Sequence, residues 1–96
     1  MVNNSKTKLV YKASSNHLYS EIGDEAVILD LNSGTYYGLN DVGVDLWRWL
    51  QEAQSKEQIL NLLLDEYEVT RQQAEKDLEA IFTQFIEVGL IEEATE

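Results

Sequence analysis

Alternating hydrophobic and polar positions in the first part of the chain predict a small antiparallel sheet. From His17 to Ile22 the pattern has a period of two, which is typical of a strand with one buried face. A turn composition at 23–25 separates it from 26–31, a short apolar run with β-branched residues that predicts a central strand. Residues 32–34 end in glycine and predict a three-residue hairpin loop, after which 35–39 is expected to return antiparallel.

After residue 39 the hydrophobic spacing changes to that of a helix. Asn40 is a favourable N-cap, because its short polar side chain can accept a hydrogen bond from the first turn. Apolar positions then recur at i, i+3, i+4 and i+7, which places them on one stripe of a helix that is expected to end near residue 53. The residues of this stripe are Gly43, Leu46, Trp47 and Leu50.

Two further helices are predicted, each opened by a capping box in which Ser or Thr is followed three residues later by Gln. Ser55 begins one at about 56–66, and Thr70 begins the other at about 71–88. Gly89 is suited to the left-handed conformation that ends a helix. Three short strands followed by three helices predict an α+β domain that resembles a winged helix-turn-helix, with a three-stranded antiparallel sheet.

The two ends of the chain lie outside this pattern. Residues 1–13 are mostly polar and are expected to form a flexible N-terminal segment, although Leu9 and Tyr11 alternate with polar neighbours and permit a short extended stretch. Residues 93–96 are expected to be an acidic tail. The folded domain is therefore predicted to span residues 14–92.

Composition excludes several classes of function. The chain has no cysteine, so it has no disulfide, thiolate nucleophile or cysteine metal site. Its 18 acidic and 7 basic residues give a net charge of −11, which would repel the phosphate backbone of a nucleic acid. No apolar run approaches the roughly 20 residues of a membrane span, and the N-terminus lacks the apolar region of a signal peptide. A cytoplasmic protein is expected.

The sequence offers little chemistry for catalysis. His17 is the sole histidine and stands beside a turn, and a zinc site without further histidine or cysteine would be unusual. The carboxylates are scattered at surface spacings, and no group of glycines matches a phosphate-binding loop. We therefore expect neither an enzyme, nor a metal centre, nor a bound cofactor.

The strand expected at 35–39 is the candidate for function. Its two tyrosines point to opposite faces, and packing in the core is one sufficient explanation for them. If the strand lies at an edge, its unpaired backbone groups can instead accept a peptide as an additional strand. If the third helix lies alongside, its spacing supplies the opposite wall of a groove. The candidate peptide-binding residues are Thr35, Tyr36, Tyr37, Gly38, Leu39, Asp77, Ala80, Ile81 and Gln84.

A longer ordered pattern runs through these elements and resembles a known family. The chain carries Leu29-Asp30-Leu31-x-x-Gly34-x-Tyr36-Tyr37-Gly38-Leu39-Asn40-x-x-Gly43-x-x-Leu46-Trp47-x-x-Leu50, then Ala74-x-x-Asp77-Leu78-x-x-Ile81-x-x-x-Phe85 and Gly89-Leu90-Ile91. In order and spacing, over about residues 17–92, the pattern closely resembles the PqqD family. This family is the prototype of the recognition element in pathways to ribosomally made, post-translationally modified peptides (the RiPP recognition element).

The resemblance implies a small non-catalytic protein that binds the leader segment of a precursor peptide and presents it to maturation enzymes. It also implies that the leader adds as a strand at 35–39, against the third helix. The Leu-Asn-x-x-Gly-x-x-Leu-Trp form at 39–47 is most similar to the stand-alone leader-binding proteins of lasso-peptide biosynthesis. Their partners are a leader peptidase and a macrolactam synthetase. A PqqD-type peptide chaperone for a radical SAM enzyme, in pyrroloquinoline quinone or related biosynthesis, is the alternative.

The winged-helix architecture also raises DNA binding as a function. That function needs a basic recognition helix, yet residues 56–69 contain one lysine and four acids. The third helix has Arg71 and Lys76 near its start as its basic residues. The charge pattern disfavours DNA binding. A structural subunit or an inhibitor remains as a further alternative if no leader binds.

Overall fold

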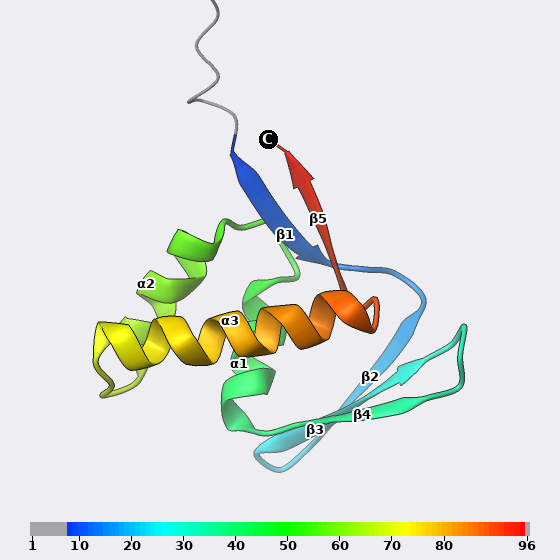
Figure 1. Cartoon of the computed structure of the whole chain (residues 1–96). Helices are drawn as coiled ribbons and strands as arrows, with labels where there is room; N and C mark the ends of the chain where they lie inside the picture. The colour runs from blue at the N-terminus through cyan, green and yellow to red at the C-terminus, as the bar shows by residue number, and fades with distance from the viewer. Residues whose placement is uncertain (1–7, 96) are drawn as a thin grey trace, which may run out of the picture.

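The computed structural model describes residues 8–95 and contains two small sheets and three helices. Figure 1 shows β1 and β5 side by side at one end of the molecule and the β2–β3–β4 sheet at the other, with α3 crossing the space between. The elements are β1 (Leu9–Ala13), β2 (His17–Ile22), β3 (Glu25–Asp30), β4 (Tyr36–Leu39), α1 (Asp41–Trp49), α2 (Lys56–Glu66), α3 (Arg71–Glu87) and β5 (Ile91–Thr95).

The predicted three-stranded sheet is present, with the antiparallel order β2–β3–β4. Its second hairpin closes at Asp30, whose backbone N–H donates to the carbonyl of Thr35 at 2.9 Å. The loop is therefore four residues long, 31–34, and not the three residues that the sequence predicted. Gly34 has the positive φ of 74° that such a turn requires, and its N–H donates to the carbonyl of Asp30 at 2.7 Å.

A second sheet, formed by β1 and β5, was not predicted. Leu9 is opposite Thr95 in the antiparallel register, so the expected flexible segment and the expected acidic tail contribute paired strands instead. The hydroxyl of Tyr11 donates to Glu93 at 3.0 Å across this pair. The boundary expected after residue 13 falls at the end of β1, and that expected after residue 92 falls within β5. The expectation for residues 1–7 lies outside the described residues.

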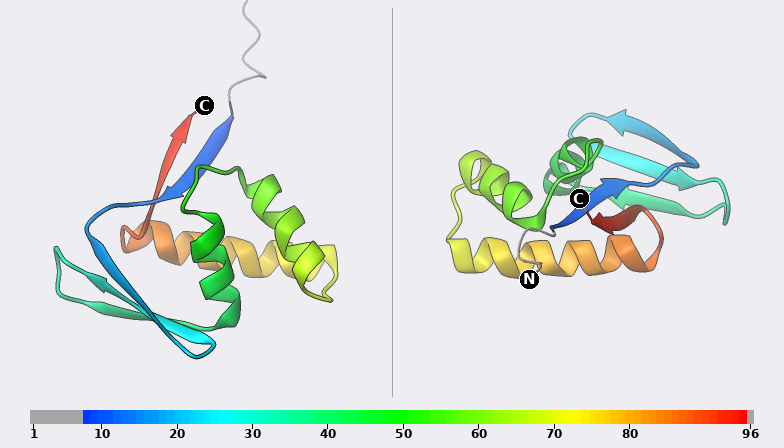
Figure 2. Two further views of the ribbon diagram at one scale, coloured as in Figure 1. Left: turned by 180° about the vertical axis from the view of Figure 1, so that it is seen from behind. Right: turned by 90° about the horizontal axis from the view of Figure 1, so that it is seen from above.

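The core lies where the three helices meet the inner faces of both sheets. Phe82 of α3 is fully buried, and its ring meets the buried ring of Tyr11 edge to face at 5.0 Å between centroids. Figure 2 shows from two sides how α3 runs past the other helices and turns back into β5. The largest side chains with almost no exposure are Phe82, Ile28, Leu46, Leu50, Ile59 and Leu90.

The two faces of β2 are used in an unexpected way. His17 and Tyr19 point toward α1, where their rings lie 5.9 and 6.2 Å from the ring of Trp47. Because strand side chains alternate, the apolar Leu18 and Ile22 then point away from the helices, and they are 57% and 69% exposed. The predicted alternation is confirmed, but the aliphatic face is the one in contact with solvent.

Local capping signals set most helix ends where the sequence placed them. The capping box of Ser55 is complete, whereas Thr70 accepts from the backbone of Gln73 and the Gln73 side chain instead donates to Asp77. Gly89, with φ 78°, ends α3 as expected. The first helix ends at Trp49, before the predicted residue 53. None of the helices within residues 8–95 is long and apolar enough to span a membrane.

Tyr67, at the C-terminal end of α2, is linked to α1. Its hydroxyl donates to a carboxylate oxygen of Asp45 at 2.5 Å. Burial, and then the hydrogen bond and charge of Asp45, raise the pKa of Tyr67 well above its ordinary value of 10.0. The folded protein therefore holds this proton more tightly than the unfolded chain does.

Tyr67→Phe is expected to lower the free energy of unfolding near neutral pH by about 1 kcal/mol, because Asp45 loses its donor. A raised pKa in the folded state adds stability below about pH 10 that is lost as the pH rises toward the folded value, so the variant should also show a flatter decline in stability above about pH 10. Urea unfolding followed by tryptophan fluorescence measures both effects. Tyr36→Phe is the control, because the Tyr36 side chain is exposed. If the free energy of unfolding of Tyr67→Phe fell with pH as steeply as that of the wild type, Tyr67 would not have a raised pKa in the folded protein.

Candidate functional site

β4 lies at the edge of its sheet, because β3 is its one strand neighbour within the described residues. Asp30 and Thr35 form a hydrogen-bonded pair at the start of this ladder. Hydrogen-bonded pairs alternate with non-hydrogen-bonded pairs along antiparallel strands. Tyr37 and Leu39, which are two and four residues beyond Thr35, therefore direct their backbone groups to β3.

Tyr36 and Gly38 occupy the alternate positions, so their backbone N–H and C=O groups point away from β3 into the open edge. Both residues are exposed. A Cβ added at Gly38 would meet no heavy atom within 4 Å, so the face of the sheet beside this residue is open. The edge therefore offers two pairs of donor and acceptor groups at the spacing that an additional strand would use.

A hollow of about 280 Å³ adjoins the end of this edge, between β4, the start of α1 and α3. Two of the predicted strand residues and two of the predicted helix residues line this hollow, so α3 lies near the end of β4. The lining residues are Gly38, Leu39, Asn40, Gly43, Ile81, Gln84 and Phe85.

The other predicted residues are not part of this hollow. Thr35, Tyr36 and Tyr37 lie farther back along the strand, and Tyr37 packs in part against the core. Asp77 and Ala80 are exposed on α3, one helical turn or less before Ile81 along the chain, and Asp77 accepts a hydrogen bond from Gln73 at 2.8 Å. The structure thus brings together four of the nine predicted residues.

Three lining residues were missed by sequence reasoning: Asn40, Gly43 and Phe85. Asn40 caps α1 by accepting from the backbone N–H of Gly43 at 2.9 Å. A Cβ at Gly43 would lie 3.3 Å from two carbons of Leu39, so the glycine lets the strand end fold closely onto the helix. The sequence did carry signals for these residues. Asn40, the N-cap of α1, directly follows the strand, and Phe85 stands four residues after Ile81, on the same face of α3.

The lining of this hollow suits binding better than acid–base chemistry. None of its residues is titratable. Buried Leu39 and Phe85 supply apolar surface, half-buried Ile81 extends it, and exposed Gln84 adds an amide at the side. Such a surface can accept an apolar side chain and hydrogen-bond a neighbouring peptide group.

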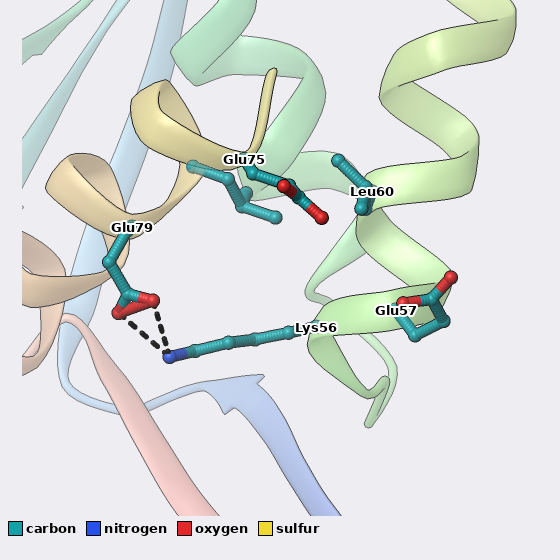
Figure 3. Close-up of a pocket in the computed structure, with 6 residues that line it drawn as sticks. Lys56, Glu57, Leu60, Glu75 and Glu79 are labelled. Carbon is teal, nitrogen blue, oxygen red and sulfur yellow. Dashed lines mark hydrogen bonds and ion pairs between the residues drawn. The ribbon is translucent and has the colours of Figure 1, made fainter. Parts of the chain in front are cut away.

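A second hollow, of about 240 Å³, lies between α2 and α3 and carries several charges (Figure 3). Lys56 reaches across it to both carboxylate oxygens of Glu79, at 2.9 and 3.2 Å, and this bond raises the pKa of Lys56. Arg71 pairs with Glu57 at 3.0 Å in the same region. These ion pairs join the two helices. Within residues 8–95, no group of His, Cys, Asp and Glu could hold a metal ion.

Comparison with known proteins identifies relatives of the chain. The family model of coenzyme PQQ synthesis protein D (PqqD) matches residues 25–91, and no curated protein matches the sequence. A solved structure of TbiB1 in complex with the TbiA(beta) leader peptide is 36% identical, with a TM-score of 0.77 over 84% of this chain and 94% of that chain. A lasso peptide synthetase B1 complexed with the leader peptide is 29% identical, with a TM-score of 0.74 over 85% and 96% of the two chains.

Proposed function

The chain belongs to the PqqD family, and we propose that it binds the leader segment of a precursor peptide as an added strand on β4. The observation that carries this proposal is the open edge: the backbone groups of Tyr36 and Gly38 point outward there, and the edge ends at an uncharged hollow. The two similar structures, each a complex with a leader peptide, support it.

The leader binds through its backbone at the edge and through its side chains on either side. Hydrogen bonds to Tyr36 and Gly38 each contribute roughly 0.5–1.5 kcal/mol. Because side chains of a strand alternate, every second leader residue faces α3, where Ile81 and Gln84 line the hollow. Leader residues between them face the outer side of the sheet. Asp77 and Ala80 would meet the leader where it continues along α3.

The proposed role is to present the leader to maturation enzymes in the cytoplasm, where ribosomes make the precursor. The likeness to a lasso peptide synthetase B1 favours a leader peptidase and a macrolactam synthetase as these enzymes. The family model, whose description names coenzyme PQQ synthesis, favours the alternative of a radical SAM enzyme in pyrroloquinoline quinone or related biosynthesis. The proposed activity itself is binding, without a catalytic step or cofactor in this chain.

Amide NMR shifts during titration with the leader peptide of the neighbouring precursor gene test the proposal. We expect the largest shifts at residues 36–39 and 81–85, together with slower hydrogen exchange at Gly38, whose N–H gains a carbonyl partner. A scrambled leader of the same composition is the control, and it should leave the chemical shifts of these amides unchanged. Shifts confined to the β1–β5 sheet would refute the assignment of the site.

A further inference from the structure

The β1–β5 sheet has one closed edge and one open edge. On the side of β1, the backbone of Tyr11 exchanges two hydrogen bonds with that of Gln54, at 2.7 and 2.9 Å. The N–H of Ala13 donates to the carbonyl of Leu50 at 2.7 Å, so the segment between α1 and α2 covers this edge. β5 has β1 as its one strand neighbour within residues 8–95, and its other edge is therefore open.

The register shows which backbone groups of β5 point into the open edge. The N–H of Ser14 donates to the carbonyl of Leu90 at 2.9 Å, so this pair begins the hydrogen-bonded positions of the ladder. Because bonded and non-bonded pairs alternate, Glu92 is a bonded position and Glu93 is a non-bonded one. Tyr11, which is opposite Glu93, accordingly turns its own backbone groups out of the pair. The N–H and C=O of Glu93 therefore point outward, at an exposed residue.

A hollow of about 350 Å³ lies on the face of this sheet that points away from α3. Tyr11 packs against Phe82 of α3, so the alternate positions of the two strands form the opposite face. Small and apolar side chains line much of the hollow there: Val10, Ala53 and Ala94. The open edge of β5 thus has the same two features as that of β4, which are outward backbone groups and a hollow next to the strand.

The charge of β5 determines which kind of strand this edge can accept. From Asp77 to the end of the chain there are six acidic residues and no lysine or arginine. Lys12 is opposite Glu92 in the register, and the rest of β5 is acidic or neutral. A second copy paired through β5 would bring the like charges of Glu92 and Glu93 together, between chains of net charge −11 each. A segment with lysine or arginine is attracted instead.

We propose that the open edge of β5 is a second strand-addition site, which takes an extended segment of a maturation enzyme with a basic residue opposite Glu93 and an apolar residue beside Ala94. Consecutive side chains of a strand lie on opposite faces, so one such pair meets both the carboxylate and the hollow. The proposal rests on the proposed function, because maturation enzymes meet this chain if it presents the leader to them. Figure 1 shows β5 and β4 at opposite ends of the molecule, so the enzyme and the leader bind at the same time.

The variant Glu93→Pro tests the added strand. Proline lacks the N–H and its ring occupies the open side, whereas the bonded positions of the ladder keep their partners. Biolayer interferometry is done with each purified maturation enzyme encoded beside the precursor gene. At least about tenfold weaker association is expected for one of them. Glu93→Gln is the matched control, because it keeps the N–H and an acceptor for Tyr11, and its association should fall by less than about threefold.

Hydrogen exchange of the wild type supplies a test that does not depend on a variant that folds. The amide of Glu93 should exchange more slowly when the enzyme is added, because its N–H gains a carbonyl partner. The amide of Glu92, which is already bonded to β1, is the internal control and should change little. Unchanged exchange at Glu93 in the saturated complex would overturn the added strand.

Charge reversal tests the basic residue of the enzyme segment. Glu93→Lys should weaken enzyme association more than Glu93→Gln does, and the wild-type association should weaken as salt is raised. Glu68→Lys, in the exposed turn between α2 and α3, should have no such effect. Equal effects of the two lysine variants would overturn the assigned position of the basic residue.

The outcomes separate this proposal from the proposed function. Unchanged association with every maturation enzyme in a folded Glu93→Pro variant overturns the β5 site, even if the leader binds at β4. Loss of leader affinity in this variant overturns it in favour of a leader that occupies both edges. A wild-type dimer that the variant converts to a monomer overturns it in favour of a second copy. Failure of the wild type to bind the leader contradicts the proposed function, whereas loss of enzyme association at full leader affinity supports the β5 site.

Discussion

Replacing Gly38 with proline is expected to reduce leader binding at least about tenfold. Proline has no backbone N–H, and its ring occupies the side of the strand where an added strand has to approach. The N–H of Gly38 points into the open edge and not toward β3, so the internal ladder keeps its hydrogen bonds. Isothermal titration calorimetry with the leader peptide gives the affinity, and thermal unfolding shows whether the domain remains folded.

Two variants separate the backbone effect from other causes. Gly38→Ala should bind the leader nearly as well as the wild type, because a Cβ at this position meets nothing within 4 Å. Tyr37→Pro should instead destabilise the domain, because the backbone of Tyr37 bonds to β3. Full leader affinity in Gly38→Pro would show that the leader does not add to this edge.

Phe82→Ala is expected to lower the free energy of unfolding by about 3–5 kcal/mol, which is the largest effect that we predict on stability. Phe82 has no exposure and contacts the ring of Tyr11, and the ammonium group of Lys56 lies 5.8 Å from its ring centroid. The variant therefore leaves a cavity between α3, β1 and α2. For a domain of this size such a loss is a large fraction of the total stability.

Ile86→Ala on the same helix is the matched control for Phe82→Ala. Ile86 is 41% exposed, and its truncation should cost less than about 1 kcal/mol. Urea unfolding of both variants, followed by circular dichroism, measures the difference. A cost at Phe82 no greater than that at Ile86 would contradict the position of the core described above.

The helices could be predicted from the sequence because their signals are local. Asn40, Ser55, Thr70 and Gly89 each act on backbone groups within five residues, so the residues that set a helix end are visible in a short window. The β2–β3–β4 order followed equally from short turns. The early end of α1 was missed because distant contacts set it: the backbone groups of Gln54 pair with those of Tyr11.

The β1–β5 sheet could not be predicted for the same physical reason. Tyr11 and Glu93 are 82 residues apart, and neither strand has a turn signal that points to its partner. Because both strands contain charged residues, their sequences resembled those of unstructured termini. The sequence also did not determine which face of β2 points toward the core, because Leu18 and Tyr19 lie on opposite faces and both are apolar enough to be buried. Contact with Trp47 selects Tyr19.

The candidate site was predicted in part. Strand alternation and the edge position of residues 35–39 follow from short-range order, and the structure has this edge. Helical spacing gave Asp77, Ala80, Ile81 and Gln84 as one face, but spacing alone does not determine where a strand meets a helix. The close contact of Leu39 with Gly43 brings the strand end toward the later part of α3, so the hollow includes Phe85 in place of Asp77.

The pairing of β1 with β5 has a consequence for how this domain can be joined to others. Leu9 lies opposite Thr95, so the two ends of the described chain leave the domain together, on the side remote from β4 (Figure 1). An enzyme, a second binding domain or a surface anchor could thus be attached at either end without covering the edge strand. The β1–β5 sheet therefore allows another domain to be fused at either end while the edge of β4 stays accessible.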